Sequence, residues 1–424
     1  MCDTVAGELI LCFPAIDFAA RNLVSLIRDH KIEHVEYVDS LENKLGRLNL
    51  KPGPDLDFDL HLVRVPSGQE SWKTTYLQFF YKDELLRAIP SSPQLFKQVL
   101  GRSDYQFTVS PNHLLSLAGS SPAAIPVSAK NFQFGNCHSQ NKQAIGLPLP
   151  TFSNPGTVRV LLLDSGVAAD AAVTVIDRRN IVDPKNLQNT QDDHGHGTGV
   201  ALLIHELAPN AQFIVYKVAD AAGRISEWDA LAGIAAKSDA QVVNLSMQFG
   251  LLDKGKGCAV CGRESTASRS AIFENIVDQL AKRNPRPVVI AAAGNYKDTN
   301  LAYPARFADV LAIGGITSQR VLSSDCNSGD TDQTGSLHKN HFVLPGGERD
   351  PSKLEAVMTS AGGKNWSGSS FACGFASGLV AELLSRQSVQ SFDFDKFVDG
   401  LRQRSDKNLP SYSTTLHGHG LMRA

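Results

Sequence analysis

The sequence predicts an α/β fold with a parallel β-sheet flanked by helices, preceded by a smaller α+β domain. Beyond about residue 150, short apolar runs alternate with helical stretches, as they do when helices cover both faces of a parallel sheet. Before residue 125, strand and helix patterns are mixed without that alternation. A polar stretch separates the two parts, so we expect two domains in the 424 residues.

The first 125 residues are expected to form the α+β domain. Residues 8–15, 57–66 and 72–81 are predicted strands, and apolar and polar residues alternate in the last of them. Residues 17–30 and 93–100 are predicted helices. This region is therefore a separate, smaller unit.

A stretch rich in Ser, Pro, Ala, Asn and Gln extends over residues 116–155. Such a composition is typical of a linker or of a segment that wraps around a neighbouring domain. We place the N-terminal domain at residues 1–125, the linker at 126–150 and the C-terminal domain at 151–424.

The C-terminal domain contains the α/β pattern. Its predicted strands are 158–163, 213–218, 241–245, 287–293 and 310–314, and its predicted helices are 198–207, 225–237, 268–283 and 370–384. Two polar, Gly-rich stretches, 250–267 and 325–341, are predicted surface insertions. Sites in such sheets form at the carboxyl ends of strands, where Asp164 and Asn295 are expected.

Three residues have the chemistry and the surroundings of a nucleophilic site. Ser370 opens a helix rich in small residues, Asp164 follows an apolar strand, and His196 begins a helix. A serine hydroxyl is a weak nucleophile and needs a neutral imidazole to take its proton. The imidazole needs a carboxylate to fix its tautomer and stabilise its charged form. The order Asp, His, Ser along the chain is that of subtilisin.

The motifs around these residues resemble the signatures of the subtilase (subtilisin-like serine protease) family. They are Asp164-Ser165-Gly166, His196-Gly197-Thr198, Gly368-Ser369-Ser370-Phe371-Ala372 and Ala291-Ala292-Ala293-Gly294-Asn295. The likeness extends from about residue 140 to the C-terminus. It implies a serine endopeptidase in which Asp164, His196 and Ser370 orient, accept the proton and attack, without a cofactor.

The resemblance also implies how the substrate is held. Asn295 is expected to donate its side-chain amide to the oxyanion, opposite the Ser370 N–H. A substrate peptide is expected to lie as an added strand between Ser246-Met247-Gln248 and Ala292-Ala293-Gly294.

The chain departs from the family pattern at three places. Gln248 stands where the family usually has Gly, and the larger side chain is expected to narrow or polarise the primary specificity pocket. The helix after His196 runs straight to Pro209, so the calcium loop of secreted subtilases is expected to be absent and no metal is predicted. Cys373-Gly374-Phe375 replaces Ser-Pro-His, which changes packing but no catalytic role.

Each of these residues could also have a purely structural role. Taken singly, Ser370 is a helix N-cap, Asp164 a strand-end carboxylate and Asn295 a turn residue. A metal site on His194, His196 and a nearby carboxylate would leave the other motifs unexplained, and we expect His194 to be a solvated neighbour. An esterase using the same triad, or a catalytically silent peptide-binding or regulatory protein, are the alternative functions.

Cysteines and the C-terminal histidines carry weaker signals. Cys258 and Cys261 form a lone CxxC, for which zinc binding, a redox pair and ordinary surface thiols are all possible. His417 and His419 are expected in a turn that closes the domain. Seven scattered cysteines do not suggest a disulfide framework.

The bulk composition limits location and partners. A net charge of −2 gives no basis for nucleic-acid binding. The N-terminus lacks a secretory signal pattern, and no run is long and apolar enough to span a membrane. We therefore expect a cytoplasmic protease that acts on protein or peptide substrates.

The role of residues 1–125 has two interpretations. Their position fits a propeptide that the enzyme removes itself, with cleavage in the polar stretch after residue 116. Their size and the absent signal peptide favour a retained accessory domain through which a regulator acts or a target is recruited.

Overall fold

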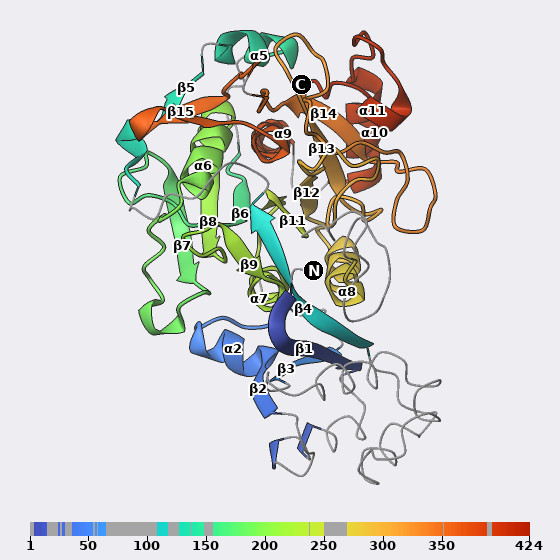
Figure 1. Ribbon diagram of the computed structural model, residues 1–424. Coiled ribbons are helices and arrows are strands. Elements are labelled where there is room, and N and C mark those ends of the chain that lie inside the picture. Colours follow the sequence, from blue (N-terminus) through green and yellow to red (C-terminus); the bar gives the residue numbers. More distant parts are fainter. Residues whose placement is uncertain are drawn as a thin grey trace. The chain divides into compact units, whose positions relative to one another are not determined.

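The computed structural model describes most of the chain in two compact units (Figure 1). The described residues are 4–14, 36–53, 58–64, 108–117, 127–135, 137–147, 156–236, 238–249, 269–350, 352–387 and 392–424, with 24, 25, 28, 29 and 56. The first unit comprises residues 1–114, 226–237 and 250–276. The second comprises residues 115–225, 238–249 and 277–424.

The first unit is built on antiparallel strands. β1 (Thr4–Pro14) pairs with β3 (Phe58–Arg64) and with the first residues of β4 (Thr108–Leu117), and β3 pairs with β2 (Glu36–Ser40). Helices α2 (Leu41–Arg47) and α7 (Glu227–Ala235) belong to this unit, and the Lys44 ammonium contacts Asp229 at 2.6 Å. The strands predicted at 8–15 and 57–66 are confirmed. The strand predicted at 72–81 and the helix at 93–100 lie outside the described residues, as does most of the helix at 17–30.

The second unit contains a seven-stranded parallel sheet. Its order is β14-β13-β12-β10-β6-β8-β7, and every described pair in it is parallel. The strands are β6 (Arg159–Asp164), β7 (Thr174–Asn180), β8 (Gln212–Lys217), β10 (Val242–Leu245), β12 (Val288–Ala292), β13 (Leu311–Ile316) and β14 (His341–Pro345). The parallel α/β prediction is confirmed. β7 and β14 were not predicted.

The sheet of the second unit is buried on both faces. In β6, Val160 and Leu162 join the large hydrophobic cluster, whereas Leu161 and Leu163 are just as buried on the opposite face. The cluster includes helices α6 (His196–Leu207) and α9 (Ser369–Ser385), which pack against each other. α9 also packs on β10, β12, β13 and β14. The sheet therefore holds the starts of α6 and α9 in fixed positions.

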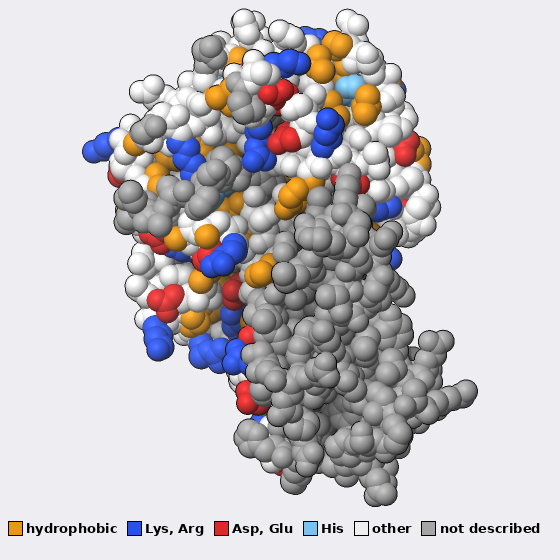
Figure 2. Space-filling model, viewed as in Figure 1, with side chains coloured by type: hydrophobic (Ala, Val, Ile, Leu, Met, Phe, Trp, Pro, Cys, Tyr) orange, Lys and Arg blue, Asp and Glu red, His pale blue; other side chains and the backbone are white. Residues whose placement is uncertain are grey.

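The remaining elements of the second unit surround this core. They are η1 (Ala129–Asn131), β5 (Gln133–Phe134), α5 (His138–Ala144), η2 (Pro184–Asn186), β9 (Arg224–Ser226), β11 (Met247–Phe249), β15 (Met358–Ser360), η3 (Ala361–Gly363), β16 (Lys364–Trp366), α10 (Phe394–Arg404) and α11 (Thr414–His417). α8 (Ala271–Ala281) and β9 each have residues in both units. Over the visible face, basic and acidic side chains are interspersed (Figure 2).

The polar stretch after residue 116 contains ordered structure. β5 pairs with β15, and Ile145 and Leu147 are buried in the core of the second unit. It is thus a wrapping segment over its described part, as one of the two interpretations held. The helix predicted at 225–237 begins only at Glu227, because Ile225 belongs to β9 and Ser226 caps the helix.

The stretch 325–341 is a surface insertion only in part. Cys326, Asn327 and His338 are buried, and His341 begins the fully buried strand β14, whereas residues 334–337 are exposed. Asn327 and His338 form hydrogen bonds within the second unit, so composition alone misplaced them. The insertion predicted at 250–267 lies outside the described residues. Among the described residues, no helix is both long and apolar enough to cross a membrane.

Candidate active site

Asp164 lies at the end of β6, where the strand order of the parallel sheet reverses. β8 lies on one side of β6 and β10 on the other, so the connections leave in opposite directions. Asp164 is fully buried, and its Oδ1 accepts hydrogen bonds from the Ser165 N–H (2.7 Å) and hydroxyl (3.3 Å). The carboxylate is therefore fixed before any partner is considered.

His196 is the first residue of α6, and its backbone passes close to the Asp164 turn. A side chain at Gly197 would bring a Cβ within 2.2 Å of the Gly166 carbonyl oxygen, so only glycine allows this approach. Asp192 fixes the start of the helix. Its carboxylate accepts from the His194, Gly195 and Thr198 N–H groups and from the Thr198 hydroxyl at 2.7–3.0 Å.

Asp164 and His196 form a buried pair. The His196 Nδ1 lies 2.9 Å from Asp164 Oδ1 and 3.0 Å from Oδ2, and both side chains are fully buried. This contact assigns the proton to Nδ1. The opposite ring nitrogen, Nε2, forms no hydrogen bond with any residue that the structure describes. It can therefore accept a proton from an attacking hydroxyl.

Ser370 is the second residue of α9, at the helix N-terminus. The next residue, Phe371, has its ring 5.5 Å from the His196 ring, centroid to centroid, so the first turn of α9 lies close to the imidazole. The Ser246 hydroxyl donates to the Ser370 carbonyl oxygen at 3.0 Å. A helix N-terminus presents N–H groups to developing negative charge.

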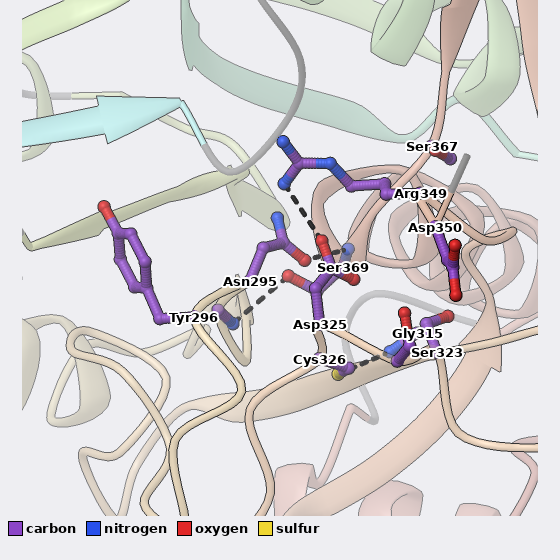
Figure 3. A network of polar contacts seen from close by, with 12 residues as sticks. Asn295, Tyr296, Gly315, Ser323, Asp325, Cys326, Arg349, Asp350, Ser367 and Ser369 are labelled. Carbon is purple, nitrogen blue, oxygen red and sulfur yellow. Dashed lines mark hydrogen bonds and ion pairs between the residues drawn. The ribbon is translucent and has the colours of Figure 1, made fainter. Parts of the chain in front are cut away.

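Asn295 follows β12 and is bound to the start of α9. Its Oδ1 accepts from the Ser369 N–H at 2.9 Å, so the carboxamide nitrogen is turned away from Ser369 (Figure 3). Its own backbone N–H donates to Gln248 Oε1 at 3.0 Å. Both bonds fix the orientation of a side-chain donor next to the Ser370 helix.

The expected substrate-binding residues occupy two different environments. Ala292 and Ala293 are buried in the sheet, where the Ala293 N–H donates to the Ile313 carbonyl and the Gly294 N–H donates to the Ser369 hydroxyl. The Ala293 and Gly294 N–H groups are therefore already bound within the protein and are not open to a substrate.

Ser246, Met247 and Gln248 lie beside the end of β4. Antiparallel pairs join Met247 to Leu117, Gln248 to Ser116 and Phe249 to Leu115. The other side of that segment is bound through the Leu117 N–H to the Gly223 carbonyl at 3.0 Å. The edge that was expected to receive a peptide holds a segment of the chain itself.

A hollow of about 260 Å³ adjoins this segment. The residues that line it are Ser116, Leu117, His194, Ala222, Gly223, Gln248, Asn295, Tyr296 and Arg349. Arg349 pairs with Asp325 at 3.1 Å (Figure 3). Burial raises the pKa of Asp325, and the Arg349 guanidinium opposes that shift.

The expectation that His194 is solvated was wrong. Its side chain is buried, and its ring lies 5.9 Å from the Trp366 ring in an edge-on arrangement. Burial lowers the pKa of His194 to about 4, so the imidazole is neutral near pH 7. It packs against the site. His417, expected in a closing turn, is the last residue of α11 and is buried.

The described residues contain no cluster of three or more His, Cys, Asp or Glu side chains that could hold a metal ion. Cys137, Cys326 and Cys373 are free thiols and are buried, and the Cys12 side chain is buried as well. Cys258 and Cys261 lie outside the described residues.

Sequence reasoning missed Asp192 as the residue whose carboxylate binds the N–H groups at the start of α6, and Arg349 and Asp325 as a pair beside the site. The run Asp192-Asp193-His194-Gly195-His196 carried a signal for the first, because acidic side chains just before a helix accept from its first N–H groups. The Arg349–Asp325 pair joins residues 24 positions apart and has no local sequence signal.

Comparison with known proteins places this arrangement in a family. The model of the subtilase family matches residues 90–392, more than half of the chain. An alkaline protease of Alkalihalobacillus alcalophilus is 30% identical over 168 residues, which cover 37% of this chain and 39% of the relative. Subtilisin BL of Lederbergia lenta is 29% identical over 168 residues, covering 37% of this chain and 55% of the relative. The matched part thus spans little more than half of these relatives at most.

A solved structure has the same fold over nearly the whole chain. The epidermin leader peptide processing serine protease from Staphylococcus aureus aligns with a TM-score of 0.58 over 98% of this chain and 96% of its own, at 15% identity. The family match includes all four motifs that contain Asp164, His196, Asn295 and Ser370. The chain belongs to the subtilase family.

Proposed function

We propose that the protein is a serine endopeptidase in which Ser370 attacks the peptide carbonyl. His196 takes the hydroxyl proton at Nε2 and later gives it to the leaving amine, while Asp164 holds the ring and stabilises its charged form. The observation that carries this proposal is the fully buried Asp164–His196 pair, whose second ring nitrogen makes no hydrogen bond to a described residue.

Two donors are proposed to stabilise the oxyanion. The Ser370 N–H points out of the start of α9, and the Asn295 carboxamide is oriented by the bond from its oxygen to the Ser369 N–H. Donors fixed before the reaction need no reorganisation when charge develops, which is why they lower the barrier.

The substrate is proposed to be a protein or peptide bound as a strand on β11. The chain's own residues Leu115–Leu117 already bind there by antiparallel pairing, which supports the edge's capacity for an extended peptide. The same occupancy supports regulation by the N-terminal part of the chain, because a substrate and this segment need the same hydrogen-bonding groups.

The test is labelling with a fluorophosphonate together with hydrolysis of a casein or peptide substrate. Ser370→Ala is expected to abolish both, with a kcat loss of roughly 10⁶-fold as in subtilisin. Ser369→Ala is the matched control, since the Ser369 hydroxyl accepts only from the Gly294 N–H among the described contacts. It should keep its labelling.

The alternatives give different results. A catalytically silent binding protein would show no labelling in the wild type. An esterase would hydrolyse activated esters but not the corresponding amides. Labelling that persists in Ser370→Ala and disappears in Ser369→Ala would overturn the assignment of the nucleophile.

A further inference from the structure

The ladder on β11 gives the register in which an extended chain approaches Ser370. The pairs Leu115–Phe249, Ser116–Gln248 and Leu117–Met247 advance one residue at a time. A substrate that continued this register by one residue past Met247 would place that residue opposite Ser246, whose hydroxyl is bound to the Ser370 carbonyl. That residue would lie beside the start of α9, and we take its carbonyl as the one that Ser370 attacks.

Gln248 lies across the space that this residue's side chain needs. Residues two apart on a strand share a face, and directly opposed residues of an antiparallel pair share it too. Gln248 and the residue opposite Ser246 are therefore diagonal neighbours on one face. The Gln248 side chain is 3% exposed, and it spans from β11 to the Asn295 N–H.

The turn at Gly294, beside Gln248, is tightly packed. Gly294 has a φ of +110°, and a Cβ there would lie 2.7 Å from the Asn327 Nδ2 and 2.9 Å from the Ala302 Cβ. The turn therefore has little room to move back when a larger substrate side chain approaches Gln248.

We propose that Gln248 is a specificity-determining residue that restricts the substrate residue before the scissile bond to Gly, Ala or Ser. The proposal rests on the proposed endopeptidase function and names its substrate class. A larger side chain would have to displace the Gln248 carboxamide and break its hydrogen bond to Asn295. The chain's own sequence after Leu117 is Ala118-Gly119-Ser120-Ser121, in which every side chain is small.

The experiment uses the full chain and heptapeptides Leu-Ser-Leu-X-Gly-Ser-Ser, with X as Ala or Phe. Wild type is expected to cleave after Ala with a kcat/KM at least about tenfold above that for Phe. Gln248→Gly should raise kcat/KM for the Phe peptide at least tenfold, mainly through KM. The tethered segment 115–117 competes equally with both peptides, so it does not change their ratio.

Gln248→Met is the matched control. It keeps the length of the side chain but replaces the amide oxygen that accepts from the Asn295 N–H with a much weaker acceptor. It should retain the preference for Ala and lower kcat for both peptides. If Gln248→Gly leaves the Ala-to-Phe ratio unchanged, or wild type prefers Phe, the proposal is wrong while the protease function stands.

A second readout covers the case in which no peptide is cut. Fluorescence anisotropy with the same labelled peptides measures their binding to Ser370→Ala and to Ser370→Ala/Gln248→Gly. Tighter binding of Ala than of Phe by the first, reversed or abolished in the second, supports the proposal without any catalysis. Equal affinities in both variants overturn it. Loss of fluorophosphonate labelling in wild type would count only against the proposed function.

Discussion

At the residue scale, two hydrogen bonds to Asn295 determine how its side-chain carboxamide is oriented. Its oxygen is committed to the Ser369 N–H and its backbone N–H to Gln248, so its carboxamide cannot turn over without losing a bond. An acceptor that is already used leaves the amide N–H group as the part that interacts with a reacting oxygen.

Asn295→Ala is expected to lower kcat by about 10²–10³ with little change in KM, the size of effect known for subtilisin. The donor acts on charge that develops only in the transition state. Asn295→Asp separates the two roles, since it can still accept from Ser369 but cannot donate, and it should lose at least as much. Steady-state kinetics on one peptide measures both. A change confined to KM would mean that Asn295 positions substrate.

The motifs suggested that Asp164 and His196 meet, as they do, but not that both side chains are fully buried. Asp164 and His196 could be paired from the sequence because each follows an element boundary at the same edge of the sheet. His194 was expected in solvent because polar neighbours surround it in the sequence. Its burial comes from Trp366, 172 residues later, and such a contact is invisible to a local pattern.

At the scale of elements, α9 and α6 must approach closely to place Ser370 and His196. A Cβ on Gly378 of α9 would lie 2.8 Å from the Leu207 Cβ and 3.1 Å from the Ile204 carbonyl oxygen. Small residues in α9 therefore serve the packing of the helix pair.

Gly378→Ala is expected to destabilise the protein by about 1–3 kcal/mol because it overpacks this interface. Gly400→Ala is the matched control in α10, where the nearest atom to the added Cβ is the mobile Arg404 Nη1 at 3.5 Å. It should stabilise by about 0.5–1 kcal/mol through helix propensity. Urea unfolding followed by circular dichroism compares the two. Equal effects would contradict the close approach.

The apolar strands were predictable because burial on both faces leaves a continuous apolar run. β7 was missed because its sequence, Thr-Val-Ile-Asp-Arg-Arg-Asn, is polar and belongs to an edge strand with half-exposed residues. β14 was missed because its apolar residues follow a polar stretch, which is itself partly buried. Both strands owe their place to tertiary packing.

At the scale of the whole molecule, burial of histidines couples folding to pH. Burial lowers the pKa of His61 to about 4 in the first unit, and of His194 and His341 to about 4 and 3 in the second. The unfolded chain binds protons on these rings below about pH 6.5, whereas the folded chain does not. The free energy of unfolding is therefore not reduced by these histidines above about pH 6.5. It falls as the pH falls from there towards 4, because protonation then favours the unfolded chain.

His341→Phe is expected to reduce the fall in melting temperature between pH 7.5 and pH 5. Each buried histidine costs on the order of 2 kcal/mol at pH 5, and the variant lacks one of them. Phe342→Leu disturbs the next buried position without removing a titrating group, so its pH dependence should match wild type. For each protein, the melting temperature at pH 5 is subtracted from that at pH 7.5. A destabilisation that is the same at both pH values then cancels. A parallel shift of all three proteins would contradict the assignment.

The last prediction concerns residues 1–125, for which the sequence favoured a retained domain over a propeptide. The described ladder on β11 ends at Leu117, opposite Met247. On the register proposed above, cleavage by the enzyme itself would fall one residue further on, and this supports the propeptide. Intact-mass analysis of purified wild type is expected to show a product that begins at Gly119, and Ser370→Ala should remain full length. Ala118→Phe should block the cut, and adding Gln248→Gly should restore it, because the pocket is then open.

Other outcomes have definite meanings. A product that begins elsewhere between residues 116 and 150 would keep the propeptide but contradict the register. If wild type and Ser370→Ala both stay full length, residues 1–125 are retained, and the segment 115–117 acts as a tethered competitor. In that case Leu117→Pro, which removes the N–H that binds the Gly223 carbonyl, should raise cleavage of short peptides by weakening the competitor.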